Sequence, residues 1–297
     1  MLVVCLIWGL NFSISKGAFV RFPPLAFTAV RFAVASVLLV PLVRRMEGDS
    51  PLPAGALRRL IVLGVVGNTF YQLGFMSGLA RTSASNSALI LASMPSLVAL
   101  LAAGLGFEPA RARVIGGVLV ATTGVVLVVL ARGVGFGEGE LAGDLLTLGA
   151  VFCWAAYTLG LRTIPQGITP LRVTMVTTVA GAPGLILAGL PEMVRMDWGE
   201  VGLAGWAALA YATLFSLVLA YLIWNRSVQL VGPSRTVIYM CLTPLIAVAG
   251  AAVMLGERPR PLQAVGAVLI LAGVLLVRGR GRGADAGRIA GRPPAEG

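Results

Sequence analysis

Long apolar segments follow one another along nearly the whole chain, and short polar stretches separate them. An α-helix needs about 20 apolar residues to cross the roughly 30 Å hydrocarbon core of a bilayer. The segments lack the alternation typical of membrane β-strands, so we predict an all-α integral membrane protein with ten transmembrane helices. The predicted segments are 2–20, 25–43, 57–79, 84–106, 113–131, 143–162, 169–190, 202–228, 233–255 and 261–278.

The composition supports this class and leaves no room for a soluble domain. Of the 297 residues, 58% are hydrophobic and 12% are charged, and the mean hydropathy is +0.92. A soluble chain of this length needs far more polar surface. Because the connections between segments are short, we expect the lipid bilayer to surround most of the chain.

The chain carries 23 Lys and Arg residues and a net charge of +11. With the ten segments in place, fifteen of these residues fall on the side of the membrane that holds both termini, and seven fall on the other side. Cytoplasmic loops are enriched in basic residues, so both termini are predicted in the cytoplasm. The Arg- and Gly-rich stretch 280–297 resembles an RNA-binding segment, but we favour a disordered basic tail and expect no nucleic-acid partner.

A pattern in the first half of the chain recurs in the second half. At an offset of 149 residues, Pro95 corresponds to Pro244 and Glu108 corresponds to Glu257. The recurrence predicts two copies of one five-helix unit. The expected division is a first repeat at 1–132, a linker at 133–142, a second repeat at 143–279 and the tail at 280–297.

The number of helices per repeat decides how the two repeats are oriented. Because five is odd, the second repeat enters the membrane from the opposite side, and the repeats have inverted topology around a central cavity. Glu108 is then expected at the cytoplasmic face and Glu257 at the outer face. Inverted repeats are typical of secondary transporters, which open a central site to either side by alternating access.

Pro95 and Pro244 lie near the middle of their predicted helices. Each lacks a backbone N–H, so the carbonyl group four residues earlier, at Leu91 or Met240, loses its helical partner and the helix kinks. We predict that the two prolines are hinges of alternating access. A static kink without functional motion is the alternative.

Polar and aromatic side chains inside the helices are candidates for contact with a solute, because lipid-facing positions need only aliphatic residues. Trp8 corresponds to Trp154 at an offset of 146 residues, and Gln72 corresponds to Tyr221 at an offset of 149. Helix packing or an interfacial aromatic belt would explain any one of these residues equally well. The candidate substrate-binding residues are Trp8, Asn11, Arg31, Tyr71, Gln72, Trp154, Tyr157, Tyr221 and Tyr239.

Arg31 lies about seven residues into its predicted helix, deep enough to meet the carboxylate of a solute. The alternative is that its side chain reaches back to the membrane interface. Arg235, near the start of the ninth segment, is a weaker candidate for the same role.

The chain has no His, and no Asp or Glu falls in the middle third of a predicted helix. Membrane hydrolases need a nucleophile with a base, paired carboxylates or a metal-ligand cluster, so we expect no enzyme and no metal ion or other cofactor. Proton-coupled export of cationic drugs usually needs an intramembrane carboxylate, so a zwitterionic or anionic solute is favoured. The same absence favours facilitated export, with proton coupling left open.

Four stretches carry a family resemblance. They are WGLNFSISKGAF at 8–19, PPLAFTAVRFAVA at 23–35, a stretch at 78–109 that contains MPSLVALLAAGLGFEP, and a stretch at 228–276 that contains TPLIAVAGAAVMLGERP. In this order they resemble the EamA-type transporters of the drug/metabolite transporter superfamily. The chain departs from the family pattern at Gly106-Phe107-Glu108, where Leu-Gly-Glu is usual.

The resemblance implies ten helices in inverted repeats, the bacterial inner membrane and export of small metabolites. Exporters of amino acids, including aromatic ones, are prominent in the family. We therefore expect an exporter of amino acids with aromatic or other apolar side chains. The alternative is export of another small solute, such as a purine, a nucleotide sugar, an organic acid or a drug. The oligomeric state is left open, and a monomer is compatible with the sequence.

Overall fold

The computed structural model describes residues 1–48, 51–53, 55–107, 112–130 and 138–278, and within these ranges every regular element is a helix. The α-helices are α1 (Leu2–Ala18), α2 (Pro24–Glu47), α3 (Ala56–Gly64), α4 (Tyr71–Arg81), α5 (Ala84–Leu91), α6 (Met94–Gly104), α7 (Ala112–Leu130), α8 (Glu138–Gly160), α9 (Pro170–Arg195), α10 (Gly202–Tyr211), α11 (Ala220–Val231), α12 (Pro233–Val237), α13 (Thr243–Leu255) and α14 (Pro261–Arg278). The same ranges hold the π-helices η1 (Val65–Phe70) and η4 (Ala212–Leu219) and the 3₁₀-helices η2 (Leu161–Thr163), η3 (Trp198–Val201) and η5 (Ile238–Leu242).

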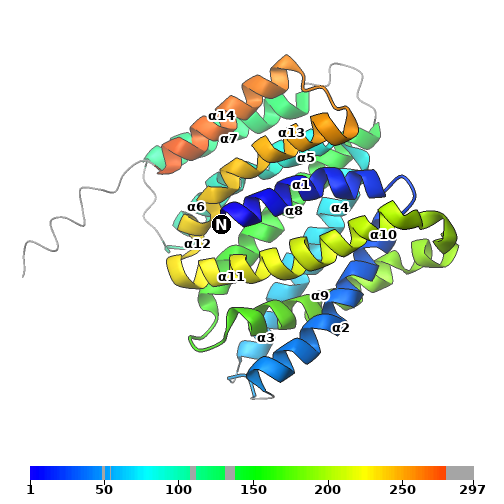
Figure 1. The fold of residues 1–297 in the computed structure, drawn as a ribbon. Helices are drawn as coiled ribbons and strands as arrows, with labels where there is room; N and C mark the ends of the chain where they lie inside the picture. Colours follow the sequence, from blue (N-terminus) through cyan, green and yellow to red (C-terminus); the bar gives the residue numbers. More distant parts are fainter. Residues whose placement is uncertain (49–50, 54, 108–111, 131–137, 279–297) are drawn as a thin grey trace, which may run out of the picture.

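The helices lie side by side in one bundle, with α7 and α14 along one edge and α2 and α9 along the opposite edge (Figure 1). Between these edges, α1 packs against α13, and α4 packs against α8. Glu108, the first half of the predicted linker (133–137 of 133–142) and the tail at 280–297 lie outside the described residues.

Within the described part of the chain, six helical segments are long and apolar enough to cross a bilayer. Four shorter apolar helices fall in the remaining predicted segments. The all-α class is therefore confirmed for the described residues, and six segments have the length and composition of membrane spans. The crossing of the bilayer by all ten segments stays a prediction. The six longer segments are Pro24–Glu47, Ala56–Arg81, Ala84–Gly104, Gly139–Thr163, Pro170–Arg195 and Trp198–Val231, and the four shorter ones are Leu2–Ala18, Ile115–Val128, Thr243–Leu255 and Pro261–Leu276.

Glycines bring α7 and α14 into close contact. A Cβ atom at Gly124 would lie 2.6 Å from the carbonyl oxygen of Gly266, and a Cβ atom at Gly273 would lie 2.5 Å from that of Gly117. Small residues at such contacts let membrane helices approach closely. Since Gly117 corresponds to Gly266 and Gly124 to Gly273 at the offset of 149, exchanging the two halves of the chain exchanges the two contacts.

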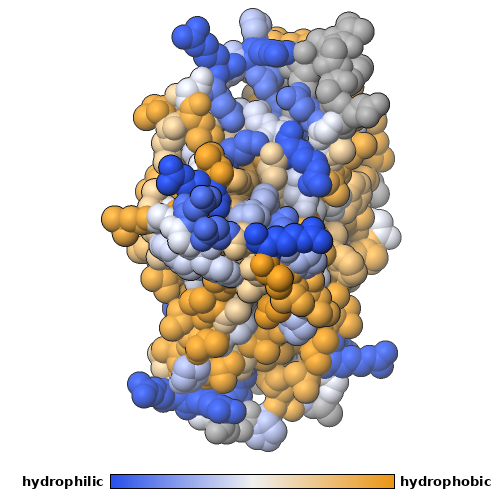
Figure 2. All heavy atoms as spheres, turned by 90° about the vertical axis from the view of Figure 1, so that its right-hand side faces the viewer, coloured by the Kyte–Doolittle hydropathy of each residue, from blue (hydrophilic) through white to orange (hydrophobic). Residues whose placement is uncertain are grey.

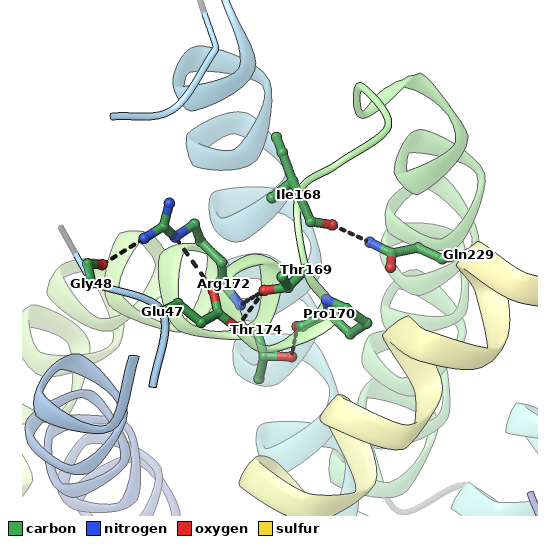
Figure 3. Close-up of polar contacts among 8 residues, drawn as sticks. All are labelled: Glu47, Gly48, Ile168, Thr169, Pro170, Arg172, Thr174 and Gln229. Carbon is green, nitrogen blue, oxygen red and sulfur yellow. Dashed lines mark hydrogen bonds and ion pairs between the residues drawn. The ribbon is translucent and has the colours of Figure 1, made fainter. Parts of the chain in front are cut away.

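Carboxylates join α2 and α9 at both of their ends. Near the end of α9, Glu192 accepts hydrogen bonds of 2.8 and 2.9 Å from two backbone N–H groups in the first turn of α2. Near the end of α2, Glu47 accepts a 2.6 Å hydrogen bond from Thr169 Oγ1 and lies 3.6 Å from Arg172 Nε at the start of α9 (Figure 3). Each helix thus places a negative charge at the partner's N-terminus, where unpaired N–H groups and the helix dipole stabilise it.

The two predicted proline kinks are breaks between helices. In the first half α5 ends at Leu91 and α6 begins at Met94, with Pro95 in its first turn. In the second half the five-residue 3₁₀-helix η5 precedes α13, which begins at Thr243 with Pro244 next. Proline fits a first turn because the N–H group there has no helical partner. The expectation of a continuous kinked helix is therefore corrected.

Both halves also carry a π-helical stretch at corresponding positions, because the offset of 149 places η1 within η4. Asn68 Nδ2 donates to the carbonyl oxygen of Thr177 at 2.7 Å, and Thr69 Oγ1 donates to that of Gly181 at 2.8 Å. These bonds hold η1 against α9. Turns of π-helix are frequent at functional sites in membrane and soluble proteins alike.

Polar contacts that involve Lys16, Thr82, Ser85 and Glu257 join the helices at one end of the bundle. We call this end of the bundle the Glu257 end. Lys16 Nζ donates to three carbonyl oxygens around the end of α4, including that of Thr82 at 2.6 Å. The Glu257 carboxylate accepts from Ser85 N at 3.0 Å and from Ser85 Oγ at 2.6 Å, at the start of α5. Figure 2 looks onto this end, where hydrophilic side chains gather and hydrophobic side chains cover the flanks.

Candidate functional site

A narrow cavity lies between helices of both halves of the chain. It encloses about 30 Å³, which is room for about two water molecules. Pockets that enclose a small-molecule ligand measure roughly 300 Å³ or more, so the cavity is contracted in this structure. The lining residues are Trp8, Asn11 and Phe12 of α1, Arg31 of α2, Tyr71, Gln72 and Phe75 of α4, Leu91, Met94, Trp154 of α8, Ser216 of η4, Tyr221 of α11, Met240 of η5 and Thr243.

Both helix breaks border this cavity. Leu91 and Met94 stand on either side of the break before Pro95, and Met240 and Thr243 stand at the junction before Pro244. A change of angle at either break would therefore move residues of the cavity wall.

Arg31 is the charged residue of the lining. Its side chain is 1% exposed, which excludes the alternative that it reaches back to the membrane interface. Among the described residues, neither Nε nor Nη1 has a hydrogen-bond acceptor, and the guanidinium lies 5.7 Å from the ring centre of Phe32. A buried cation without a counter-charge is costly, so Arg31 is a candidate for contact with an anionic ligand.

Two amide side chains also line the cavity with unpaired oxygens. Asn11 Oδ1 and Gln72 Oε1 are buried without a hydrogen-bond donor from the described residues. Gln72 Nε2 donates to the hydroxyl oxygen of Tyr221 at 3.2 Å, and this bond holds the amide across the interface between the two halves. The cavity therefore combines open donors on one residue with open acceptors on two others.

Aromatic rings form much of the wall. Trp154 lies with its ring centre 4.8 Å from that of Tyr71, 5.1 Å from Tyr221 and 5.6 Å from Trp8. Trp8 Nε1 donates to the carbonyl oxygen of Ser216 at 3.0 Å, which fixes this indole against η4. The wall thus combines aromatic rings with the polar side chains described above.

Two predicted residues lie apart from the lining. Tyr157 is buried behind Trp154, and its hydroxyl group donates to Asn225 Oδ1 at 2.9 Å, so it supports the wall from outside. Tyr239 is 44% exposed, because it lies in the 3₁₀-helix η5 and not on an α-helical face shared with Thr243. Arg235 has a side chain outside the described residues.

The sequence did not single out Trp224, which belongs to the same aromatic cluster. Its ring centre lies 5.3 Å from that of Trp8 and 5.6 Å from that of Trp154. The available signal was its position three residues after Tyr221, on the same face of α11. Within the described residues, no group of three His, Cys, Asp or Glu side chains could hold a metal ion.

Asp144 is a carboxylate that the sequence places at a helix end and the structure places inside the bundle. Because α8 begins at Glu138, Asp144 lies more than one turn into the helix and is buried. Its Oδ1 atom accepts a 2.7 Å hydrogen bond from Thr82 Oγ1. Asp144 does not belong to the cavity lining, so it does not supply the charge that Arg31 lacks.

Known proteins provide an independent comparison. A sequence model of the EamA-like transporter family matches the chain twice, at residues 1–130 and at residues 141–279. The uncharacterized transporter YyaM of Bacillus subtilis is 31% identical over 91% of this chain and 90% of its own length. A probable amino-acid metabolite efflux pump of Salmonella typhimurium is 26% identical over 93% of this chain and 92% of its own.

A further relative and a solved structure extend the comparison. A probable terminal-alkyne amino-acid exporter of Streptantibioticus cattleyicolor is 28% identical over 84% of this chain and 82% of its own. A crystal structure of a protein that is 19% identical aligns with a TM-score of 0.64 over 92% of this chain and 94% of that chain, which supports the fold. Together these matches confirm the prediction of a multi-pass membrane transporter and not an enzyme. The chain belongs to the EamA-like transporter family.

Proposed function

We propose that this chain is a secondary transporter of the bacterial inner membrane that exports small metabolites, in particular amino acids with aromatic or other apolar side chains. The observation that carries the proposal is Arg31, a buried cation that lines the cavity with two unpaired donor nitrogens. A carboxylate pairs with a guanidinium through two parallel hydrogen bonds, and such bonds are strong where water is excluded. A solute with a carboxylate would supply the counter-charge that the cavity lacks.

The aromatic wall supports an apolar solute side chain. Trp8, Tyr71, Trp154 and Tyr221 surround the cavity with ring faces and edges. Such surfaces bind planar or aliphatic groups. Two relatives whose names refer to amino acids and their metabolites support the same solute class.

Two inverted repeats, at 1–132 and 143–279, would supply the moving parts. The exchange of the Gly124–Gly266 contact with the Gly117–Gly273 contact supports this arrangement, since antiparallel copies produce that pattern. The two family matches, one per half, support it as well. Alternating access then consists of rocking one repeat against the other around the cavity.

The contracted cavity fits an intermediate of this cycle. It is too small for an amino acid, so loading and release require the wall to open. The breaks before Pro95 and Pro244 border the cavity and are the proposed hinges. A stretch of 3₁₀-helix within a long helix often marks such a hinge, which supports the assignment for η5.

With both termini in the cytoplasm, the Glu257 end faces outward, and the opposite end, at Glu47, faces the cytoplasm. Arg258→Cys and Arg45→Cys place single thiols at exposed positions near the two ends, in a chain otherwise freed of Cys. A membrane-impermeant thiol reagent added to intact cells is expected to label position 258 and to leave position 45 unlabelled. Labelling of both positions from outside would contradict the proposed topology.

Export of an organic acid is the second candidate, because such a solute also satisfies Arg31. A nucleotide sugar also brings an anion to the guanidinium, because phosphate pairs with arginine as carboxylate does. Neutral purines and drugs without an anionic group bring none. They therefore fit the cavity less well.

Transport by purified protein in liposomes tests the proposal. Arg31→Gln is expected to raise the KM for phenylalanine exchange by at least about 30-fold, since loss of one partner of a buried charge pair costs roughly 2–5 kcal/mol. Arg81→Gln is the matched control, because Arg81 is exposed and donates to Ser77 in its own helix. Equal KM values for the two variants would contradict the assignment of Arg31.

A further inference from the structure

We propose that Asn11 and Gln72 form an acceptor pair for the ammonium group of the solute, so that the carrier selects α-amino acids over carboxylic acids with the same side chain. The inference rests on the proposed function, since it assumes that Arg31 binds the carboxylate. It adds a specificity that Arg31 alone does not provide.

The unpaired buried atoms of the cavity lining match the two ends of a zwitterion. They are Nε and Nη1 of Arg31, Oδ1 of Asn11 and Oε1 of Gln72. Arg31 offers donors that a carboxylate accepts, and the two amides offer neutral acceptors that an ammonium group needs. An organic acid would leave both amide oxygens buried and unpaired, which is costly.

A hydrogen bond to the second half of the chain holds the amide of Gln72. Its Nε2 atom is bound to the hydroxyl oxygen of Tyr221, so the amide is held at its nitrogen and its oxygen is left open. Asn11 lies one turn after Trp8 on α1, and Trp8 is fixed to Ser216. Both acceptors thus lie on side chains or helices that the second half of the chain holds in place.

Neutral acceptors suit this cavity better than a carboxylate would. A carboxylate in the lining would pair with Arg31 and remove the site for the solute's own carboxylate. Amide oxygens bind an ammonium group without competing for the guanidinium. The aromatic faces of Tyr71 and Trp154 add a favourable surface for the same cation.

The first test uses the unmodified protein in liposomes and compares phenylalanine with 3-phenylpropanoate, which lacks the amine. We expect phenylalanine to be preferred by at least about tenfold in kcat/KM, because a site built for a hydrogen-bonding group rejects the analogue without it. Equal use of the two compounds overturns the inference and leaves Arg31 and the proposed function standing. Transport of neither compound overturns the proposed function itself.

The second test uses Asn11→Leu and Gln72→Met, which remove the oxygens and keep similar volumes. We expect the preference for phenylalanine to fall to within about threefold of unity, with 3-phenylpropanoate transport retained. Thr158→Val is the matched control, since the Thr158 hydroxyl group is also buried without a hydrogen-bond partner among the described residues but does not line the cavity. An unchanged preference in both amide variants, or equal loss of both compounds, overturns the assignment.

Discussion

The two halves of the chain have corresponding helices but unlike side chains at the cavity. At offsets of 146 and 149 residues, Asn11 corresponds to Tyr157 and Gln72 corresponds to Tyr221. The amide oxygens of the first half are buried without a partner, whereas Tyr157 donates to Asn225 at 2.9 Å. At these positions the first half has amide oxygens without a hydrogen-bond donor among the described residues, and the second half has tyrosine rings and hydroxyl groups.

The two halves also differ at the position of Arg31. Pro24 and Pro170 begin α2 and α9, and their offset of 146 pairs Arg31 with Thr177. Thr177 is uncharged, and its Oγ1 atom donates to the carbonyl oxygen of Val173 in its own helix at 2.9 Å. The second half therefore has no counterpart to the unpaired guanidinium of Arg31 at this position. Under the proposed function, the duplication would provide the helical frame, and the differences between the two copies would provide recognition of an asymmetric solute.

The largest effect on transport is expected at Arg31, where the two halves differ in charge. Arg31→Gln should reduce kcat/KM for phenylalanine by at least about 30-fold, because it removes a buried charge partner. Thr177→Val, at the corresponding position, should reduce it by less than about threefold, since that hydroxyl group bonds within its own helix. Exchange measurements on both variants in liposomes check this, and similar losses would show that the halves contribute alike.

The next largest effect is on stability, at the two glycine contacts between α7 and α14, where the halves are alike. Gly124→Val and Gly273→Val should each destabilise the protein by about 2 kcal/mol, because each added side chain meets the backbone of the facing helix. Gly116→Val in α7 is the control, since no described atom of another helix lies within 4 Å of a Cβ atom there. Thermal unfolding in detergent gives the ranking. A large loss at one glycine and none at the other would break the equivalence of the two contacts.

A smaller effect is expected at the two ends of the α2–α9 pair. Glu192→Gln should cost about 1 kcal/mol, because it removes a charge that caps two N–H groups of α2. Glu47→Gln should cost less, since solvent screens a pair that is partly exposed. The unfolding temperatures of the two variants check the order, and a greater loss at Glu47 would reverse it.

The smallest effects concern the two breaks. Pro95→Ala and Pro244→Ala should each slow transport by a few-fold with little change in unfolding temperature, because alanine is accepted in a helical first turn. The slowing should be greater for Pro244→Ala, since five residues of 3₁₀-helix precede it. Transport rates at matched expression measure this. Full rates in both variants would leave the prolines as static features.

The positions of the helices could be predicted from the sequence, because a bilayer demands long apolar runs whatever the tertiary contacts are. A change from α-helix to 3₁₀-helix within an apolar segment could not be predicted from the sequence. An α-helix would place Tyr239 on the face of Thr243, four residues later, but η5 turns by more per residue and exposes Tyr239. The start of α8 at Glu138 likewise buries Asp144, which the predicted boundary at 143 puts at the helix end.

The site was predictable as a set of residue types and not as a set of pairings. Trp8, Gln72 and Trp154 line the cavity as the offsets suggest. That Arg31 Nε and Nη1 meet no acceptor among the described residues depends on what the other helices bring to them, which no local pattern encodes. Trp224 was missed because a single indole on an apolar helix resembles a lipid-facing or interfacial residue.

The pairing of Arg31 with a solute carboxylate is the central claim, and counterflow with the unmodified protein tests it most directly. Liposomes loaded with unlabelled phenylalanine should accumulate labelled phenylalanine, and liposomes loaded with phenylalaninamide, which lacks the carboxylate, should not. Equal accumulation with the two internal compounds would contradict the claim.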